Sequence, residues 1–108
     1  MAILHWKIQR LSAIALIPLI LYISFYLFNI NSLTYSEIVY DLSSLPGIII
    51  VTISSLILFT HSSLGIETIL EDYIHDMYLQ NILVSISKTI HVILFSSTII
   101  LLAIIKGI

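Results

Sequence analysis

The chain has 108 residues, of which 59% are hydrophobic and 9% are charged, with a formal net charge of −2 and a mean hydropathy of +1.15. A soluble domain carries roughly 25% charged and about 45–50% apolar residues, so this composition excludes a soluble globular enzyme and a disordered tail. Four basic residues make no patch that could hold phosphates, which excludes nucleic acid as a partner. The absence of cysteine excludes disulfides and thiolate-ligated metals. We therefore expect a membrane protein.

Three long apolar runs follow one another along the chain and predict a single all-α membrane domain, 1–108. They cover residues 11–30, 45–70 and 82–105. About 20 apolar residues allow a helix to cross the ~30 Å hydrocarbon layer, and a helix satisfies its own backbone hydrogen bonds in lipid. We expect three transmembrane helices in up-down-up order. A chain of this size does not easily enclose a site alone, so we expect these helices to pack against a partner.

Charged residues lie mainly at the ends of these runs and predict the orientation. Lys7 and Arg10 precede the first run, and the first connection, 31–44, carries acidic residues but no basic one. The second connection, 71–81, is acidic, with Lys88 just beyond it. Basic residues favour the cytoplasmic or matrix side. The N-terminus and the second connection are therefore predicted on that side.

Two features inside the runs concern helix shape and packing. Pro18 cannot donate a backbone hydrogen bond, so it is expected either to kink the first helix or to leave a carbonyl that a neighbouring group takes up. Small hydroxylated residues recur in the second run and would allow close approach of a neighbouring helix. They are Thr52, Ser54, Ser55, Thr60, Ser62 and Ser63.

His61 is the main candidate for chemistry, because it lies well inside the second run. Ionisable residues at membrane depth are rare and face a bundle interior or a cavity, and a neutral imidazole is a good axial ligand for haem iron. Gly65 lies four residues on, hence on the same helical face, where a missing side chain would let a porphyrin approach the backbone. The alternative is a histidine that only hydrogen-bonds a neighbouring helix.

Asp72 and Tyr73 follow His61 by eleven and twelve residues. Eleven residues at 100° each return to within about 20° of the same face, so Asp72 would lie on the His61 face, about 16 Å along the axis, if the helix continues that far. A phenol at this level could donate to a quinone oxygen. The alternative is a solvated helix-end charge beside an aromatic residue of the membrane interface.

Arg10 and His91 each have two interpretations. Arg10, near His5 and Trp6, could pair with haem propionates or could extend to the lipid headgroups as a positive-inside anchor. His91 lies inside the third run and could be a second functional histidine. We favour a buried polar group that is bonded to a neighbouring helix.

Three stretches together resemble one known family. They are residues 4–14 (LHWKIQRLSAI), 61–74 (HSSLGIETILEDYI) and 72–80 (DYIHDMYLQ). The first is similar to the arginine-containing start of the first helix in the small membrane-anchor subunit of succinate dehydrogenase, respiratory complex II. The second has the pattern of that family, a His, a Gly four residues later, and an Asp-Tyr pair at eleven and twelve. The resemblance covers nearly the whole chain.

The resemblance implies a role for each matching residue. His61 would be one axial ligand of a haem b that is shared with the larger anchor subunit, Gly65 would pack against the haem, and Arg10 would lie near its propionates. Tyr73 would hydrogen-bond ubiquinone, and Asp72 would help to orient the quinone site. The chain would then be a non-catalytic subunit of a succinate:quinone oxidoreductase.

The same resemblance implies partners and a location. A flavoprotein subunit would oxidise succinate, an iron–sulfur subunit would carry the electrons to the membrane, and this chain and the larger cytochrome b anchor subunit would dock that head. The membrane would be the mitochondrial inner membrane, with an organelle-encoded chain, or a bacterial inner membrane.

Three alternatives stand beside this interpretation. A fumarate reductase anchor has the same architecture and works in the opposite direction. A small proton-pathway subunit of NADH dehydrogenase would need carboxylates at mid-membrane depth, whereas the third run has none and Glu67 lies near an end of the second. A membrane scaffold without a cofactor is the third.

Overall fold

The computed structural model describes residues 2–107 and is helical, with no strand in that part of the chain. Three of its helices are long and apolar enough to cross a membrane, as predicted. In chain order the elements are α1 (Ala2–Phe28), the short 3-10 helix η1 (Ile30–Ser32), α2 (Tyr35–Ser43), α3 (Leu45–Tyr73) and α4 (Met77–Lys106).

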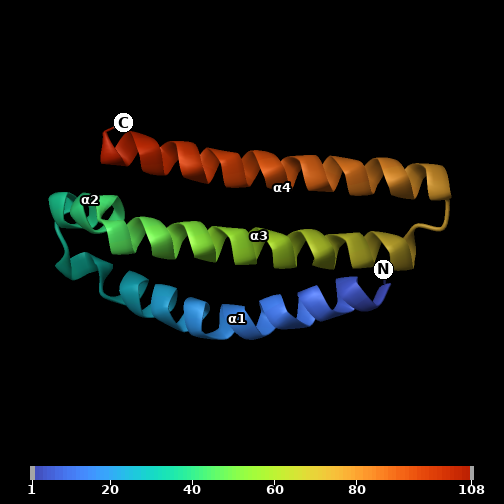
Figure 1. Ribbon diagram of the computed structural model, residues 1–108, viewed down its shortest axis with the longest axis horizontal. Helices are drawn as coiled ribbons and strands as arrows, with labels where there is room; N and C mark the ends of the chain where they lie inside the picture. Colours follow the sequence, from blue (N-terminus) through green and yellow to red (C-terminus); the bar gives the residue numbers. More distant parts are fainter. Residues whose placement is uncertain (1, 108) are drawn as a thin grey trace.

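The three long helices lie side by side in one row, with α3 in the middle (Figure 1). Successive long helices run in opposite directions, which confirms the predicted up-down-up order. Between residues 2 and 107, α1 and α4 each contact α3 but not one another. The start of α1 lies at the same end of the row as the turn between α3 and α4, whereas α2 and the end of α4 lie at the other end (Figure 1).

The long helices extend beyond most ends of the apolar runs. The first starts at Ala2 rather than at residue 11 and stops at Phe28, the second continues to Tyr73, and the third starts at Met77 rather than at residue 82. Helices of 27 to 30 residues are about 40–45 Å long, which matches the hydrocarbon core plus the headgroup regions. Polar residues that were predicted to flank the spans, such as Lys7, Arg10 and Asp72, are therefore helical, and helices of this length are long enough to reach into the headgroup regions.

The turn between α3 and α4 is much shorter than the predicted connection, 71–81. Only residues 74–76 are not helical. Asp76 begins α4 by accepting a hydrogen bond from the backbone N–H of Tyr78 at 3.2 Å. The Gln80 side chain donates to the Ile74 carbonyl oxygen at 2.8 Å and so ties the turn to the first turn of α4. These local bonds fix the position of the α3 end that carries Tyr73.

The helix α2 lies in the first connection, for which no helix was predicted. It begins with a capping box, in which Thr34 Oγ1 accepts from the Glu37 N–H at 3.2 Å and Glu37 Oε2 accepts from the Thr34 N–H at 2.8 Å. The Tyr26 hydroxyl donates to Asp41 Oδ2 at 3.1 Å and links α1 to α2. Gly47 lies directly against the Asp41 carbonyl, where a Cβ would clash. The helix is therefore held across one end of α3.

Very little of the chain is buried within it. Leu16 and Leu102 are the buried apolar residues of the described part, and Ser12 and Ser54 are the buried polar ones. Most large apolar side chains lie on the outer surface, which only lipid or another subunit can cover. The helix α1 is bowed with its concave side towards α3 (Figure 1), and it contains Pro18, which removes one backbone hydrogen bond.

Candidate functional site

His61 and Gly65 lie where α3 packs against α1. The Nδ1 atom of His61 is 2.9 Å from Ser12 Oγ, and Ser12 is only 8% exposed. One turn further along α3, a Cβ placed on Gly65 would lie 4.0 Å from Gln9 Nε2. Both residues therefore share one face, and we call the contact between α1 and this face the α1–α3 seam.

The other ring nitrogen of His61 has no partner within residues 2–107. The Nε2 atom makes no hydrogen bond there, and it is not among the unpartnered polar atoms that are fully buried. The imidazole is thus held by one nitrogen and presents the other at the surface of the chain. A group that supplies an electrophilic metal could reach this nitrogen from outside.

His91 is bound in a different way, through both of its ring nitrogens. Its Nδ1 is 2.7 Å from the Ser87 carbonyl oxygen, and its Nε2 is 3.0 Å from Ser62 Oγ on α3. A carbonyl oxygen only accepts, so Nδ1 carries the proton and Nε2 accepts from the Ser62 hydroxyl. The ring of Phe59 packs edge-on against this imidazole, with 6.4 Å between the two ring centres. His91 is therefore bonded to a neighbouring helix, as we favoured, and has no free lone pair.

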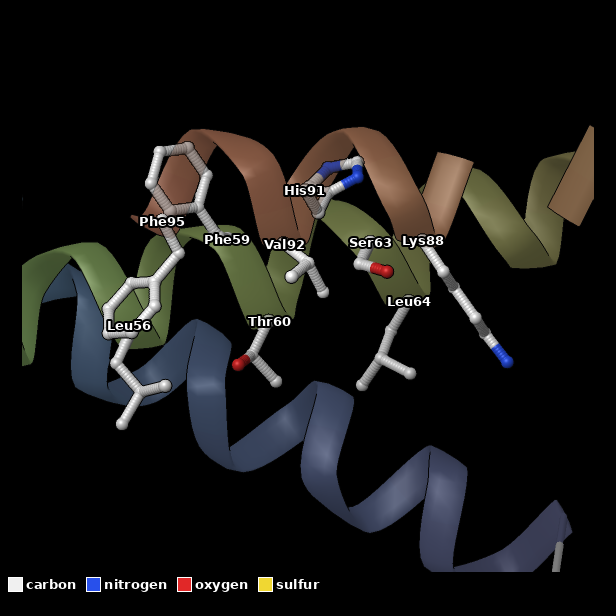
Figure 2. Close-up of a pocket in the computed structure, with 9 residues that line it drawn as sticks. All are labelled: Leu56, Phe59, Thr60, Ser63, Leu64, Lys88, His91, Val92 and Phe95. Atoms are coloured by element: carbon white, nitrogen blue, oxygen red, sulfur yellow. The ribbon is translucent and has the colours of Figure 1, made fainter. Parts of the chain in front are cut away.

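A shallow groove of about 390 Å³ runs along the other side of α3, between α3 and α4. Figure 2 shows the rings of Phe59 and Phe95 towards one end and the Lys88 side chain at the other. Lys88 Nζ lies 3.7 Å from Glu67 Oε1, so this carboxylate is paired with a cation near the end of α3. Glu67 is therefore not the unpaired carboxylate that a proton pathway would need.

Asp72 and Tyr73 form the end of α3. Because the helix is continuous from Leu45 to Tyr73, the condition for the predicted spacing is met, and Asp72 lies on the His61 face about 16 Å away along the axis. Both side chains are exposed, Tyr73 to 79%. The Tyr73 hydroxyl makes no hydrogen bond to the described residues, so the phenol is available to an outside acceptor.

Arg10 lies in α1 towards the same end of the row. Its guanidinium carbon is 5.3 Å from the centre of the Trp6 ring, a stacking contact, and it forms no ion pair within residues 2–107. The exposed cation is compatible with both interpretations that the sequence left open.

Two features of the site were not predicted from the sequence. Ser12 is an isolated hydroxyl in an apolar run, and nothing in the sequence pairs it with His61 across 49 positions. A second cavity, about 580 Å³, lies between α1, α2 and the first half of α3, where the buried Ser54 hydroxyl has no partner. The capping-box pattern at Thr34 predicts a helix there, and this was the sequence signal for α2, which lines one side of the cavity.

Within the described chain, no three His, Cys, Asp or Glu side chains come together to hold a metal ion. Of the two histidines deep inside the spans, His91 has both ring nitrogens bonded in this part of the chain, whereas His61 keeps one that could bind a metal.

Comparison with known proteins gives a consistent result. Residues 1–104 match the family described as succinate dehydrogenase/fumarate reductase transmembrane subunit. The chain is 29% identical over 84 residues to the succinate dehydrogenase hydrophobic membrane anchor subunit of Rickettsia typhi, which covers 78% of this chain and 67% of that protein. The protein of the same name from Rickettsia prowazekii gives the same values. No solved structure matches the chain significantly. The family match decides against a proton-pathway subunit of NADH dehydrogenase.

Proposed function

Because the chain belongs to the succinate dehydrogenase/fumarate reductase transmembrane subunit family, we propose that it is the small anchor subunit of a succinate dehydrogenase, respiratory complex II. The names of the two Rickettsia relatives favour this direction over fumarate reduction. As an anchor subunit it works with other subunits of the complex. In the proposal these are a flavoprotein, an iron–sulfur subunit and a larger cytochrome b anchor subunit.

The chain supplies His61 as one axial ligand of a haem b, and the larger anchor subunit supplies the other. The observation that carries this assignment is the free Nε2 of an imidazole whose Nδ1 is held by Ser12. Gly65 leaves space beside it, since even an added Cβ would lie 4.0 Å from the nearest side-chain atom, Gln9 Nε2. The residues present therefore fit the group. When bound, a haem would accept and return one electron at a potential set by its ligands and surroundings.

Tyr73 and Asp72 form this chain's part of a ubiquinone reduction site. The exposed phenol can donate a hydrogen bond to a quinone oxygen, and such a bond strengthens as negative charge develops on that oxygen during reduction. Asp72, on the His61 face, orients the groups around it. Arg10 would pair with the haem propionates, since the start of α1, which carries it, lies beside the end of α3 (Figure 1).

This end of the row faces the matrix or the cytoplasm, where the soluble head docks. Lys7 and Arg10 lie towards this end and Lys88 lies in the half of α4 that is nearer to it, whereas Lys106 is the Lys or Arg residue at the opposite end. Basic residues accumulate on the inner side of membranes. The membrane is the mitochondrial inner membrane or a bacterial inner membrane.

The haem assignment is tested by His61→Leu in the complete complex, purified in mild detergent. The variant is expected to insert and assemble but to lose the haem signal, because leucine offers no lone pair. His91→Leu is the matched control, since it removes the other intramembrane imidazole and should keep the haem. A bis-histidine optical or EPR spectrum that is unchanged in His61→Leu would refute the assignment.

The quinone assignment is tested by Tyr73→Phe, which removes only the hydroxyl. We expect ubiquinone reduction to fall far more than succinate oxidation with an artificial acceptor, because the second reaction bypasses the membrane site. Tyr78→Phe is the control, since this residue is equally exposed at 76% but lies beyond the turn. Equal losses in both assays would count against Tyr73 as a quinone contact.

A further inference from the structure

Two consecutive hydrogen bonds connect the backbone of α1 to His61. Ser12 Oγ is 2.9 Å from the Gln9 carbonyl oxygen and 2.9 Å from Nδ1 of His61. A serine hydroxyl has one hydrogen, and a carbonyl oxygen can only accept. The Ser12 hydrogen is therefore donated to Gln9, and the Ser12 oxygen must accept from the imidazole. It follows that Nδ1 of His61 carries the ring proton.

A neutral imidazole has only one N–H, so its other nitrogen keeps a lone pair. From this we infer that Ser12 is a positioning residue for His61, which fixes the imidazole in the tautomer and rotation that present the Nε2 lone pair to iron. The inference rests on the proposed haem ligation by His61. It adds a residue of α1 to the haem site, one helix away from the ligand.

The surroundings of Ser12 make this hydrogen bond effective. Ser12 is 8% exposed, so water has little access to compete for the bond within the seam. A hydrogen bond from the outer nitrogen of a metal-bound imidazole fixes the ring and raises its basicity. A more basic ligand favours the oxidised iron, so the bond is expected to lower the haem potential and strengthen haem binding.

His91 provides an internal comparison. Its Nδ1 also carries the proton, but its Nε2 already accepts from Ser62. Residues 2–107 therefore contain two interhelical serine–histidine bonds of similar length, 2.9 Å and 3.0 Å, and of these the one at Ser12 leaves Nε2 free. Ser62→Ala removes the second bond and serves as the matched control for Ser12→Ala.

The test uses the complete complex in mild detergent, with the wild type, Ser12→Ala, Ser12→Thr and Ser62→Ala compared. Haem retention is measured by transfer to apomyoglobin, and the haem is characterised by its ferric EPR signal and its midpoint potential. Loss of such an outer hydrogen bond typically weakens binding by about 10- to 100-fold. We expect haem to leave Ser12→Ala about tenfold faster, with a shifted EPR signal and a more positive potential. A tenfold loss confined to the ferric state corresponds to about 59 mV.

The outcomes separate this inference from the proposal beneath it. Normal values in Ser12→Thr, which keeps the hydroxyl, and in Ser62→Ala would support the inference. A Ser12→Ala haem that matches Ser62→Ala, or a defect that Ser12→Thr does not reverse, would overturn the role of Ser12 and leave His61 as the ligand. A wild-type complex without a bis-histidine haem would overturn both. Ser12→Cys, similar in size but a weak acceptor, replaces Ser12→Ala if the alanine variant does not assemble.

Discussion

The substitution Gly65→Ala tests whether a flat group packs against the α1–α3 seam one turn from His61. Within the chain the change should be favourable, because alanine in a helix interior is about 0.8–1.0 kcal/mol better than glycine. The new Cβ would lie 4.0 Å from Gln9 Nε2, which is ordinary van der Waals contact. The helix itself therefore gives no reason for a glycine at this position.

If a haem is held by His61 and packs on this turn, Gly65→Ala should instead be unfavourable for haem binding. Carbon atoms pack at about 3.5–4.0 Å, so a methyl group that stands roughly 1.5 Å out from the Cα would displace the ring by a similar distance. The iron–imidazole bond cannot stretch by that amount. We expect Gly65→Ala to assemble at least as well as the wild type while its ratio of haem to flavin falls.

The assay measures haem as the pyridine haemochrome and flavin by fluorescence in the purified complex. Thr60→Leu is the matched control, because it adds more bulk next to His61 but lines the groove between α3 and α4 (Figure 2). Full haem content in Gly65→Ala and also in Gly65→Leu would refute the reasoning. Loss of haem in Thr60→Leu alone would place the group on the α4 side.

Two further predictions concern the ion pair between α3 and α4 and the cap of α2. Lys88→Met leaves the Glu67 carboxylate, whose side chain is 17% exposed, without its cation, and should lower the free energy of unfolding by about 1 kcal/mol, because Lys88 itself is 58% exposed and the pair is partly screened. Adding Glu67→Gln should recover most of that loss, and additive losses in the two single variants and the double variant would contradict the pairing. Thr34→Ala removes one half of the capping box with Glu37 and should cost about 1 kcal/mol of α2 stability. Hydrogen exchange at the first turn of α2 measures it, and unchanged protection there would argue against the cap.

The three spans and their order were predictable because the signal is the length of apolar runs, which local composition determines. Their ends were less predictable. Lys7 and Arg10 were expected to flank the first helix, yet both are helical, since a helix continues into the headgroup region as long as its backbone bonds are made. Asp76 turns out to be a cap, which shortens the turn between the second and third spans to three residues.

The site was predictable along one helix and not across helices. The spacing of His61, Gly65 and Asp72 follows from the helical repeat, so one sequence suffices to put them on one face. Which helix covers that face depends on the packing of α1 on α3. The contact between Ser12 and His61 could therefore not be predicted from the sequence. The difference between His61 and His91 likewise depends on hydrogen-bond partners in other turns and helices.

The lack of a core has a consequence for the life of the subunit in the cell. In the described chain no side chain is less than 2% exposed, so the helices gain little from packing on one another. The helices of a copy made in excess of its partners would be held together only weakly. We therefore expect unassembled copies to be rapidly degraded by membrane proteases, so that the amount of this subunit follows the supply of the others.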